Sequence, residues 1–280
     1  MIYGTRKYHY DRLTELSNRG LIRRCGKYNE ITAMGMKEAG SGLKPIKITK
    51  EWAREHKARL SQVYIGLGIH QENYGAWSFI SSRDFKIKKR MVMSSKVDGC
   101  LVINGEEYAV YLLGDEPSKS SLNIIKTELN NLYIYRVAKV IVFYPTLKAL
   151  KSFESQVDSK KLSELLLIRY PEEIHLLKYM DEIKQNLTSR LKDYKPTGRP
   201  FADFERGRTY VSIMIFNDLV KKKHLLDYMN HVMAEEGREV IILCLEEQFN
   251  EMESLYPAAK EILRVRRFWG DTNVKAQGTV

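Results

Sequence analysis

Basic side chains near the amino terminus are the residues of this sequence best suited to binding an anion. Arginine can hold guanine or phosphate through two hydrogen bonds, lysine places a point charge on phosphate, and tyrosine donates to phosphate or packs on sugar. Residues 1–27 hold seven basic and two acidic side chains, a net charge of +5. The candidate DNA-binding residues in this stretch are Thr5, Arg6, Lys7, Tyr8, Asp11, Arg12, Arg23, Arg24 and Lys27.

Many of these side chains fall on a predicted helix. His9, Leu13 and Leu16 recur at the spacing of one helix face, which would point inward and make His9 a core residue. The polar and basic residues before Leu13 lie off this face, in the half of a recognition helix that reaches base edges and phosphates. Gly20 is expected to end the helix, because glycine readily adopts the left-handed conformation found there.

A basic hairpin is predicted directly after that glycine. Strands at 22–24 and 28–32 would flank a Gly26-Lys27 turn. A helix followed by such a hairpin is typical of the recognition helix and wing of a winged helix-turn-helix. Residues 1–48 are therefore predicted to form a DNA-binding domain whose first helix is missing from this numbering. That absence indicates a fragment, a later start or support from a partner.

Composition also favours an anionic partner. The 280-residue chain has a net charge of +11 and a pI near 9.3, which points to nucleic acid first and to a membrane surface second. A basic protein without such a partner is the alternative. The hydrophobic residues of the chain, 44% of the total, can build the cores of roughly two domains. With no signal peptide and no long apolar run, a cytoplasmic protein without a membrane partner is expected.

Cysteine and histidine spacing predicts neither a metal site nor a disulfide framework. Cys25, Cys100 and Cys244 are odd in number and far apart, and no CxxC pair occurs. His224 and His231 are seven residues apart on one predicted helix, too far for a ligand pair at i, i+4. No metal and no cofactor are expected.

A second group of residues could form a metal-dependent nuclease site. Such a site uses carboxylates to hold the metal and a lysine to stabilise charge at the phosphate. Asp98 suits the first carboxylate, but the following strand, Tyr108 to Leu113, contains neither a carboxylate nor a lysine. Asp84-x-Lys86 has the local pattern but precedes Asp98. The remaining candidates follow the strand: Asp115, Glu116 and Lys119. Catalysis is thus the less favoured interpretation.

The elements around these carboxylates follow the order α-β-β-β-α-β. This is the core order of the restriction-endonuclease-like, or PD-(D/E)xK, fold, and residues 49–150 are assigned to a degenerate nuclease-like α/β domain. Asn104-Gly105 predicts a hairpin turn. The predicted elements are a helix at 51–69, strands at 76–80, 98–103 and 107–113, a helix at 120–133 and an apolar strand at 138–144.

Residues 151–280 are predicted to form a C-terminal α/β extension. Strands at 209–216 and 239–245, joined by a helix, indicate a parallel βαβ unit. Long helices are expected from Pro171 to about Tyr194 and from Glu247 to about Arg267. The whole chain is therefore expected to be of the α/β (α+β) class.

Carboxylates also follow the two strands of this βαβ unit. Asp218, Glu246 and Glu247 lie where ligands bind in open parallel sheets, although caps and solvated carboxylates are the favoured interpretation. No glycine-rich phosphate loop occurs. Arginines that could extend a phosphate-contacting surface are Arg199, Arg206, Arg208, Arg264, Arg266 and Arg267.

Two motifs carry a resemblance to winged-helix domains. The first is RL-x-x-L-x-x-x-G-L-I-x-R from Arg12 to Arg24, and the second runs from Tyr28 to Gly35 and contains Ile-Thr-x-x-Gly. Together with the α-β-β-β-α-β segment, they make residues 1–150 similar to the replication-relaxation family. The resemblance implies a winged helix joined to a degenerate nuclease-like domain, in plasmids, conjugative elements and phages of Gram-positive bacteria. Tyr111 and Leu113 stand where that family often has an acidic run.

The leading hypothesis is a sequence-specific double-stranded DNA-binding protein of such a mobile genetic element. It would act in replication, transfer or transcription control, with a possible homodimer and replication or transfer proteins as further partners. Two alternatives stay open: a PD-(D/E)xK-type nuclease, and a protein-interaction scaffold whose basic helix binds an acidic protein.

Overall fold

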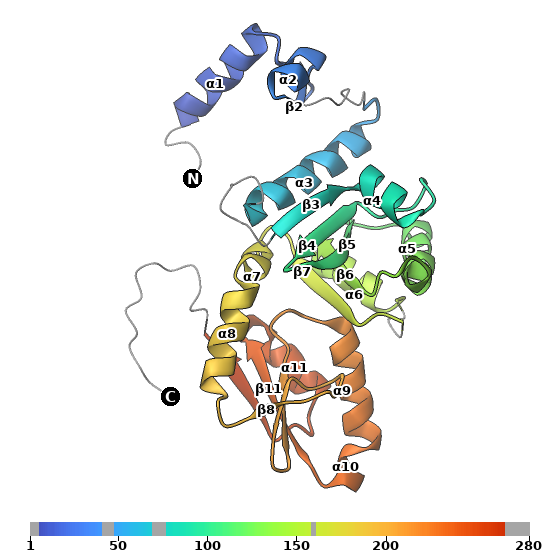
Figure 1. The fold of residues 1–280 in the computed structure, drawn as a ribbon, viewed down its shortest axis with the longest axis vertical. Coiled ribbons are helices and arrows are strands. Elements are labelled where there is room, and N and C mark those ends of the chain that lie inside the picture. Colours follow the sequence, from blue (N-terminus) through green and yellow to red (C-terminus); the bar gives the residue numbers. More distant parts are fainter. Residues whose placement is uncertain (1–5, 41–47, 69–76, 158–160, 267–280) are drawn as a thin grey trace. The chain divides into compact units, whose positions relative to one another are not determined.

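The fold is of the α/β class, with helices between the strands of two mixed five-stranded sheets and a separate two-stranded hairpin (Figure 1). The computed structural model describes residues 6–40, 48–68, 77–157 and 161–266, with the backbone alone for residues 6–9. The chain divides into two units, Met1–Gln62 and Val63–Val280.

The first unit contains the predicted helix and hairpin. Helix α1 (Arg6–Asn18) is followed by strands β1 (Ile22–Cys25) and β2 (Tyr28–Ile31), which pair antiparallel with Ile22 opposite Ile31. Short helix α2 (Ala33–Glu38) and the first turns of α3 (Glu51–Leu67) complete the unit. Helix α1 ends at Asn18, and Gly20 closes the turn after it with a φ of +68°, the left-handed conformation expected of it.

The second unit begins with a sheet in the strand order β3-β4-β5-β6-β7. Its first three strands pair antiparallel and its last three parallel. Asn104 and Gly105 form the predicted turn, with φ of 52° and 81°. The bounds are β3 (Trp77–Ser81), α4 (Ser82–Lys89), β4 (Gly99–Ile103), β5 (Glu106–Leu112), α5 (Lys119–Asn131), η1 (Leu132–Tyr135), β6 (Lys139–Tyr144), α6 (Leu147–Glu154) and β7 (Glu164–Arg169).

The order of elements predicted for residues 51–144 is confirmed, with one helix added. Helix α4 occupies the basic segment after β3, where Ser81 caps its start and Arg90 ends it in the left-handed conformation. The predicted apolar face of α5 is buried, because its leucine and isoleucine side chains recur at helical spacing and pack into the core of this sheet: Leu122, Ile125 and Leu129.

A second sheet follows in the order β12-β11-β10-β9-β8. Strands β10 and β11 pair parallel and are joined by α9, as predicted for a βαβ unit. The bounds are α7 (Ile174–Lys178), α8 (Met180–Arg190), β8 (Lys195–Pro196), β9 (Phe204–Arg206), β10 (Thr209–Ile213), α9 (Leu219–His231), α10 (Met233–Glu236), β11 (Glu239–Leu245), η2 (Glu246–Gln248), α11 (Phe249–Leu255) and β12 (Glu261–Val265).

Two predictions of long helices in this part of the chain were wrong. The helix expected from Pro171 is two helices, α7 and α8, because Tyr179 between them has φ −104° and ψ 16°. The helix expected from Glu247 ends at Leu255, and β12 follows it, parallel to β11. Pro257 explains this second break, since proline has no N–H for a helix and clashes with the preceding turn.

Within the described ranges, none of the helices has the length and apolar character needed to cross a membrane.

Candidate nucleic-acid interface

Positive charge is concentrated in the first unit. Residues 1–62 carry 14 basic and six acidic side chains, a net charge of +8, whereas the whole chain carries +11. The 218 residues of the second unit therefore carry a net charge of only +3. An anion such as a nucleic-acid backbone would be attracted mainly to the first unit.

Helix α1 presents charged side chains to solvent. Asp11 and Arg12 are exposed, and the Arg12 side chain, 45% exposed, donates to Glu15 at 2.6 Å. The Arg12 and Arg19 guanidinium groups hold the pKa of Glu15 below its usual range, with the hydrogen bond from Arg12 as the largest cause. Arg6, Lys7 and Tyr8 lie in the first turns of the helix, and Thr5 falls outside the described residues.

The apolar face of α1 is covered only in part. Leu13 and Leu16 are half-buried, whereas Tyr10 is 61% exposed. The side chain of His9 lies outside the described atoms, so its predicted place in the core stays a prediction.

The hairpin carries the other predicted basic residues, and all three are exposed. Arg23 on β1 donates to Glu30 on β2 at 2.9 Å, because the antiparallel register places the two opposite each other. The Nε of Arg24 donates to the carbonyl of Gly26 at 3.3 Å. The Lys27 ammonium lies 5.3 Å from the centre of the Tyr28 ring.

Glu30 fixes the hairpin to helix α3. Its side chain is only 16% exposed, and it accepts from Arg23, from Arg54 of α3 at 2.9 Å, and from the Cys25 thiol at 3.3 Å. These bonds, that from Arg23 first, lower the pKa of the Glu30 carboxyl. The sequence analysis did not identify Glu30, although a two-residue turn at Gly26-Lys27 places it opposite Arg23 in the hairpin.

Thr32 and Gly35 join the end of α1 to helix α2. The Thr32 hydroxyl donates to the Gly20 carbonyl at 2.6 Å and accepts from the Gly35 N–H at 3.1 Å, which caps α2. A Cβ on Gly35 would lie 2.1 Å from the Leu21 carbonyl oxygen, so only glycine fits here. The Ile-Thr-x-x-Gly motif therefore has a local structural role.

The ion pair of Arg12 leaves this arginine able to bind phosphate. Arg12 and Glu15 are 45% and 49% exposed, and exposed pairs of this kind contribute little to stability because both charges stay well solvated. Arg12 can therefore exchange its carboxylate partner for phosphate oxygens at small cost. A helix and a hairpin that both carry such side chains can contact a nucleic-acid groove and its neighbouring backbone.

The first nuclease candidate is buried and engaged with the sheet. Asp98 lies directly before β4, is 9% exposed, and accepts from the Leu112 N–H of β5 at 2.9 Å. Its own N–H donates to the Val110 carbonyl at 2.8 Å. The carboxylate therefore helps hold the end of β5 against the start of β4.

The remaining nuclease candidates do not form a metal site with it. Glu116 is exposed and pairs with Lys148 at 2.7 Å, the Asp115 carbonyl accepts from Thr146 at 3.0 Å, and Lys119 begins α5. Across the ranges that the structure describes, no group of three His, Cys, Asp or Glu residues could hold a metal ion.

The Asp84-x-Lys86 pattern also has structural partners. Asp84 accepts from the Ser81 hydroxyl at 2.6 Å at the start of α4. Lys86 is 6% exposed and donates to the Ser95 carbonyl at 2.6 Å.

The carboxylates after β10 and β11 have the local roles that the sequence favours. Asp218 caps α9, and Glu246 pairs with Arg264 at 2.7 Å. Glu247 lies in the short helix η2, while His224 and His231 lie in α9. One contact of Asp218 was not foreseen, because it crosses between sheets: its carboxylate also accepts from the Leu165 N–H of β7 at 3.1 Å.

Three comparisons with known proteins, against family models, curated proteins and solved structures, find no match for this chain.

Proposed function

We propose that the chain is a sequence-specific double-stranded DNA-binding protein that uses α1 and the β1–β2 hairpin as its contact surface. The observation that carries the proposal is the charge of its first unit, a net +8 in 62 residues. Helix α1 would enter the major groove, and the hairpin would lie on the adjacent backbone.

The basic side chains support different parts of this contact. Arg6, Lys7 and Arg12 belong to α1, where an arginine can grip guanine or phosphate through two hydrogen bonds. Arg23, Arg24 and Lys27 belong to the hairpin and would neutralise phosphates without reading sequence. The resemblance in sequence to the replication-relaxation family extends the proposal to a mobile genetic element, with a role in replication, transfer or transcription control.

Fluorescence anisotropy with a duplex selected from a random-sequence library tests the proposal. The triple variant Arg6→Ala, Lys7→Ala, Arg12→Ala is expected to abolish measurable binding, because it removes the phosphate and base contacts of α1. The matched control changes three exposed lysines of the second unit by the same charge: Lys126→Ala, Lys192→Ala and Lys195→Ala. Equal weakening in both variants would reduce the binding to a general effect of net charge and overturn the proposal.

A further inference from the structure

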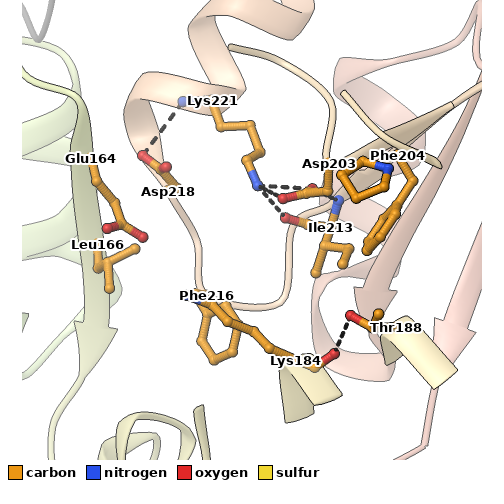
Figure 2. A pocket seen from close by; sticks show the side chains of 11 residues that line it. Glu164, Leu166, Lys184, Thr188, Asp203, Phe204, Ile213, Phe216, Asp218 and Lys221 are labelled. Carbon is orange, nitrogen blue, oxygen red and sulfur yellow. Dashed lines mark hydrogen bonds and ion pairs between the residues drawn. The ribbon is translucent and has the colours of Figure 1, made fainter. Parts of the chain in front are cut away.

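A cavity of about 370 Å³ lies in the second unit, between β7 of the first sheet and the β9–β10–α9 region of the second (Figure 2). Its volume is within the range of small-molecule sites in proteins. The lining residues come from six elements and the loops between them: Glu164, Leu166, Lys184, Thr188, Pro196, Asp203, Phe204, Ile213, Phe216, Asp218 and Lys221.

One wall of the cavity is acidic. Asp218 is 8% exposed, and its Oδ1 accepts from the N–H groups of Leu165, Val220 and Lys221. No residue in the described part of the chain donates to its Oδ2. Burial, with a smaller contribution from the charge of Glu164, raises the pKa of the Asp218 carboxyl. Figure 2 shows Glu164 on the same side of the cavity as Asp218.

The opposite wall is already neutralised. The Lys221 ammonium donates to both oxygens of Asp203, at 2.7 and 2.9 Å, and to the Ile213 carbonyl at 3.3 Å. Asp203 also accepts from the Ile213 N–H at 2.7 Å. This pair has little capacity left for a charged ligand, so the acidic wall is the place where a ligand cation would gain most.

A second cation lies at the rim. Lys184 on α8 is exposed, and among the described residues its side chain has one partner, the Phe216 ring, with 5.7 Å from ammonium to ring centre. Between this rim and the acidic wall the surface is apolar, with Leu166, Phe204, Ile213 and Phe216 all buried.

We infer that this cavity binds a small primary amine with an apolar or aromatic group. Its ammonium would bind Asp218 Oδ2, and its apolar group would pack against Phe204 and Phe216. Glu164 already accepts from the Tyr108 hydroxyl at 2.7 Å and pairs with Lys139 at 3.5 Å, so Asp218 is the carboxylate that would hold the ligand's cationic end. This site lies outside the proposed DNA-contacting unit and does not depend on that proposal.

Isothermal titration calorimetry of the full chain with three probes tests this inference. The probes are L-phenylalanine, phenethylamine, which lacks the carboxylate, and 3-phenylpropanoate, which lacks the ammonium. Phenethylamine is expected to bind most tightly and 3-phenylpropanoate least, because the buried carboxylate attracts a cation and repels an anion. No binding of phenethylamine at millimolar concentration, or tighter binding of 3-phenylpropanoate, would overturn the inference.

Two variants test which side chain holds the ligand's ammonium. Asp218→Asn removes the charge but keeps the cap of α9, since asparagine caps helices as well as aspartate. It is expected to weaken phenethylamine binding about tenfold or more, the effect of removing one charged hydrogen bond. Lys184→Gln is expected to leave phenethylamine binding unchanged. Lys192→Gln, an exposed lysine outside the lining, is the matched control. Unchanged affinity in Asp218→Asn would contradict the site.

Discussion

Asp98 has a structural role in the second unit. Its sequence position suits the first carboxylate of a nuclease site, yet the carboxylate is buried and accepts a hydrogen bond from the Leu112 N–H. The register of β4 and β5 places Tyr111 opposite Asp98, where a nuclease site would need an acidic or lysine side chain. The Tyr111 hydroxyl donates to Glu128. The buried carboxylate of Asp98 therefore stabilises the sheet through its backbone partner.

Removing the Asp98 carboxylate should lower the stability of the protein. We expect Asp98→Ala to lower the free energy of unfolding by about 1–3 kcal/mol, since it leaves the buried Leu112 N–H without its acceptor. Urea denaturation measures this, with exposed Asp227→Ala as the control. Plasmid cleavage in magnesium or manganese by the unaltered protein, abolished in Asp98→Ala, would restore the nuclease hypothesis.

Glu30 should give the first unit a pH dependence in the acid range. Arg23, Cys25 and Arg54 lower the pKa of its carboxyl below the ordinary 4.5. Its stabilising effect is therefore fully present above pH 4.5 and is lost as the pH falls through the lowered pKa. The thermal unfolding temperature should fall more steeply between pH 6 and 3 for the unaltered protein than for Glu30→Gln. Parallel curves would show that the carboxylate does not anchor the hairpin.

At the scale of elements, the packing of α2 against the α1–β1 turn holds the proposed contact surface together. Gly35→Ala is expected to disrupt the first unit, because the new Cβ would lie 2.1 Å from a backbone oxygen and 2.8 Å from the Ile31 side chain. Hydrogen exchange of α1 and the hairpin should show reduced protection, while Lys37→Ala, exposed on the same helix, should leave protection unchanged. Retained protection in Gly35→Ala would mean that α2 can move away at little cost.

The sequence predicted elements well where local signals agree. Helix α1, the hairpin after Gly20 and the Asn104-Gly105 turn all follow from spacing and turn chemistry. The prediction failed at Glu261 to Val265, because the mixed polar and apolar pattern of this short segment fits a helix or an edge strand equally well. Only the pairing with β11 decides that case, and pairing is a property of the whole fold.

The candidate sites show the same division. The exposed arginines of the hairpin could be predicted from the register of two adjacent strands. The bond of Arg54 to Glu30, and that of Leu165 to Asp218, join residues 24 and 53 positions apart. No periodicity reports such contacts, so the anchoring of the hairpin and the acidic wall of the cavity required the structure.

At the scale of the whole molecule, the two units carry very different charge. The first has a net charge of +8 and the second +3, in a chain with more than three times as many residues in the second. Net positive charge concentrated in one unit favours contact of that unit with a polyanion over general adhesion. The cavity belongs to the second unit, which carries the smaller net charge.

The salt dependence of DNA binding tests this account most directly. The measurement is the slope of log Kd against log salt concentration for one selected duplex. The unaltered protein should show a steep slope, and the Arg23→Ala, Arg24→Ala, Lys27→Ala variant should have a slope lower by about 0.9 for each phosphate that it no longer neutralises. The control variant Lys126→Ala, Lys192→Ala, Lys195→Ala should keep the original slope. Absent binding, a slope insensitive to salt, or equal slopes in the two variants would contradict a DNA contact made by the first unit.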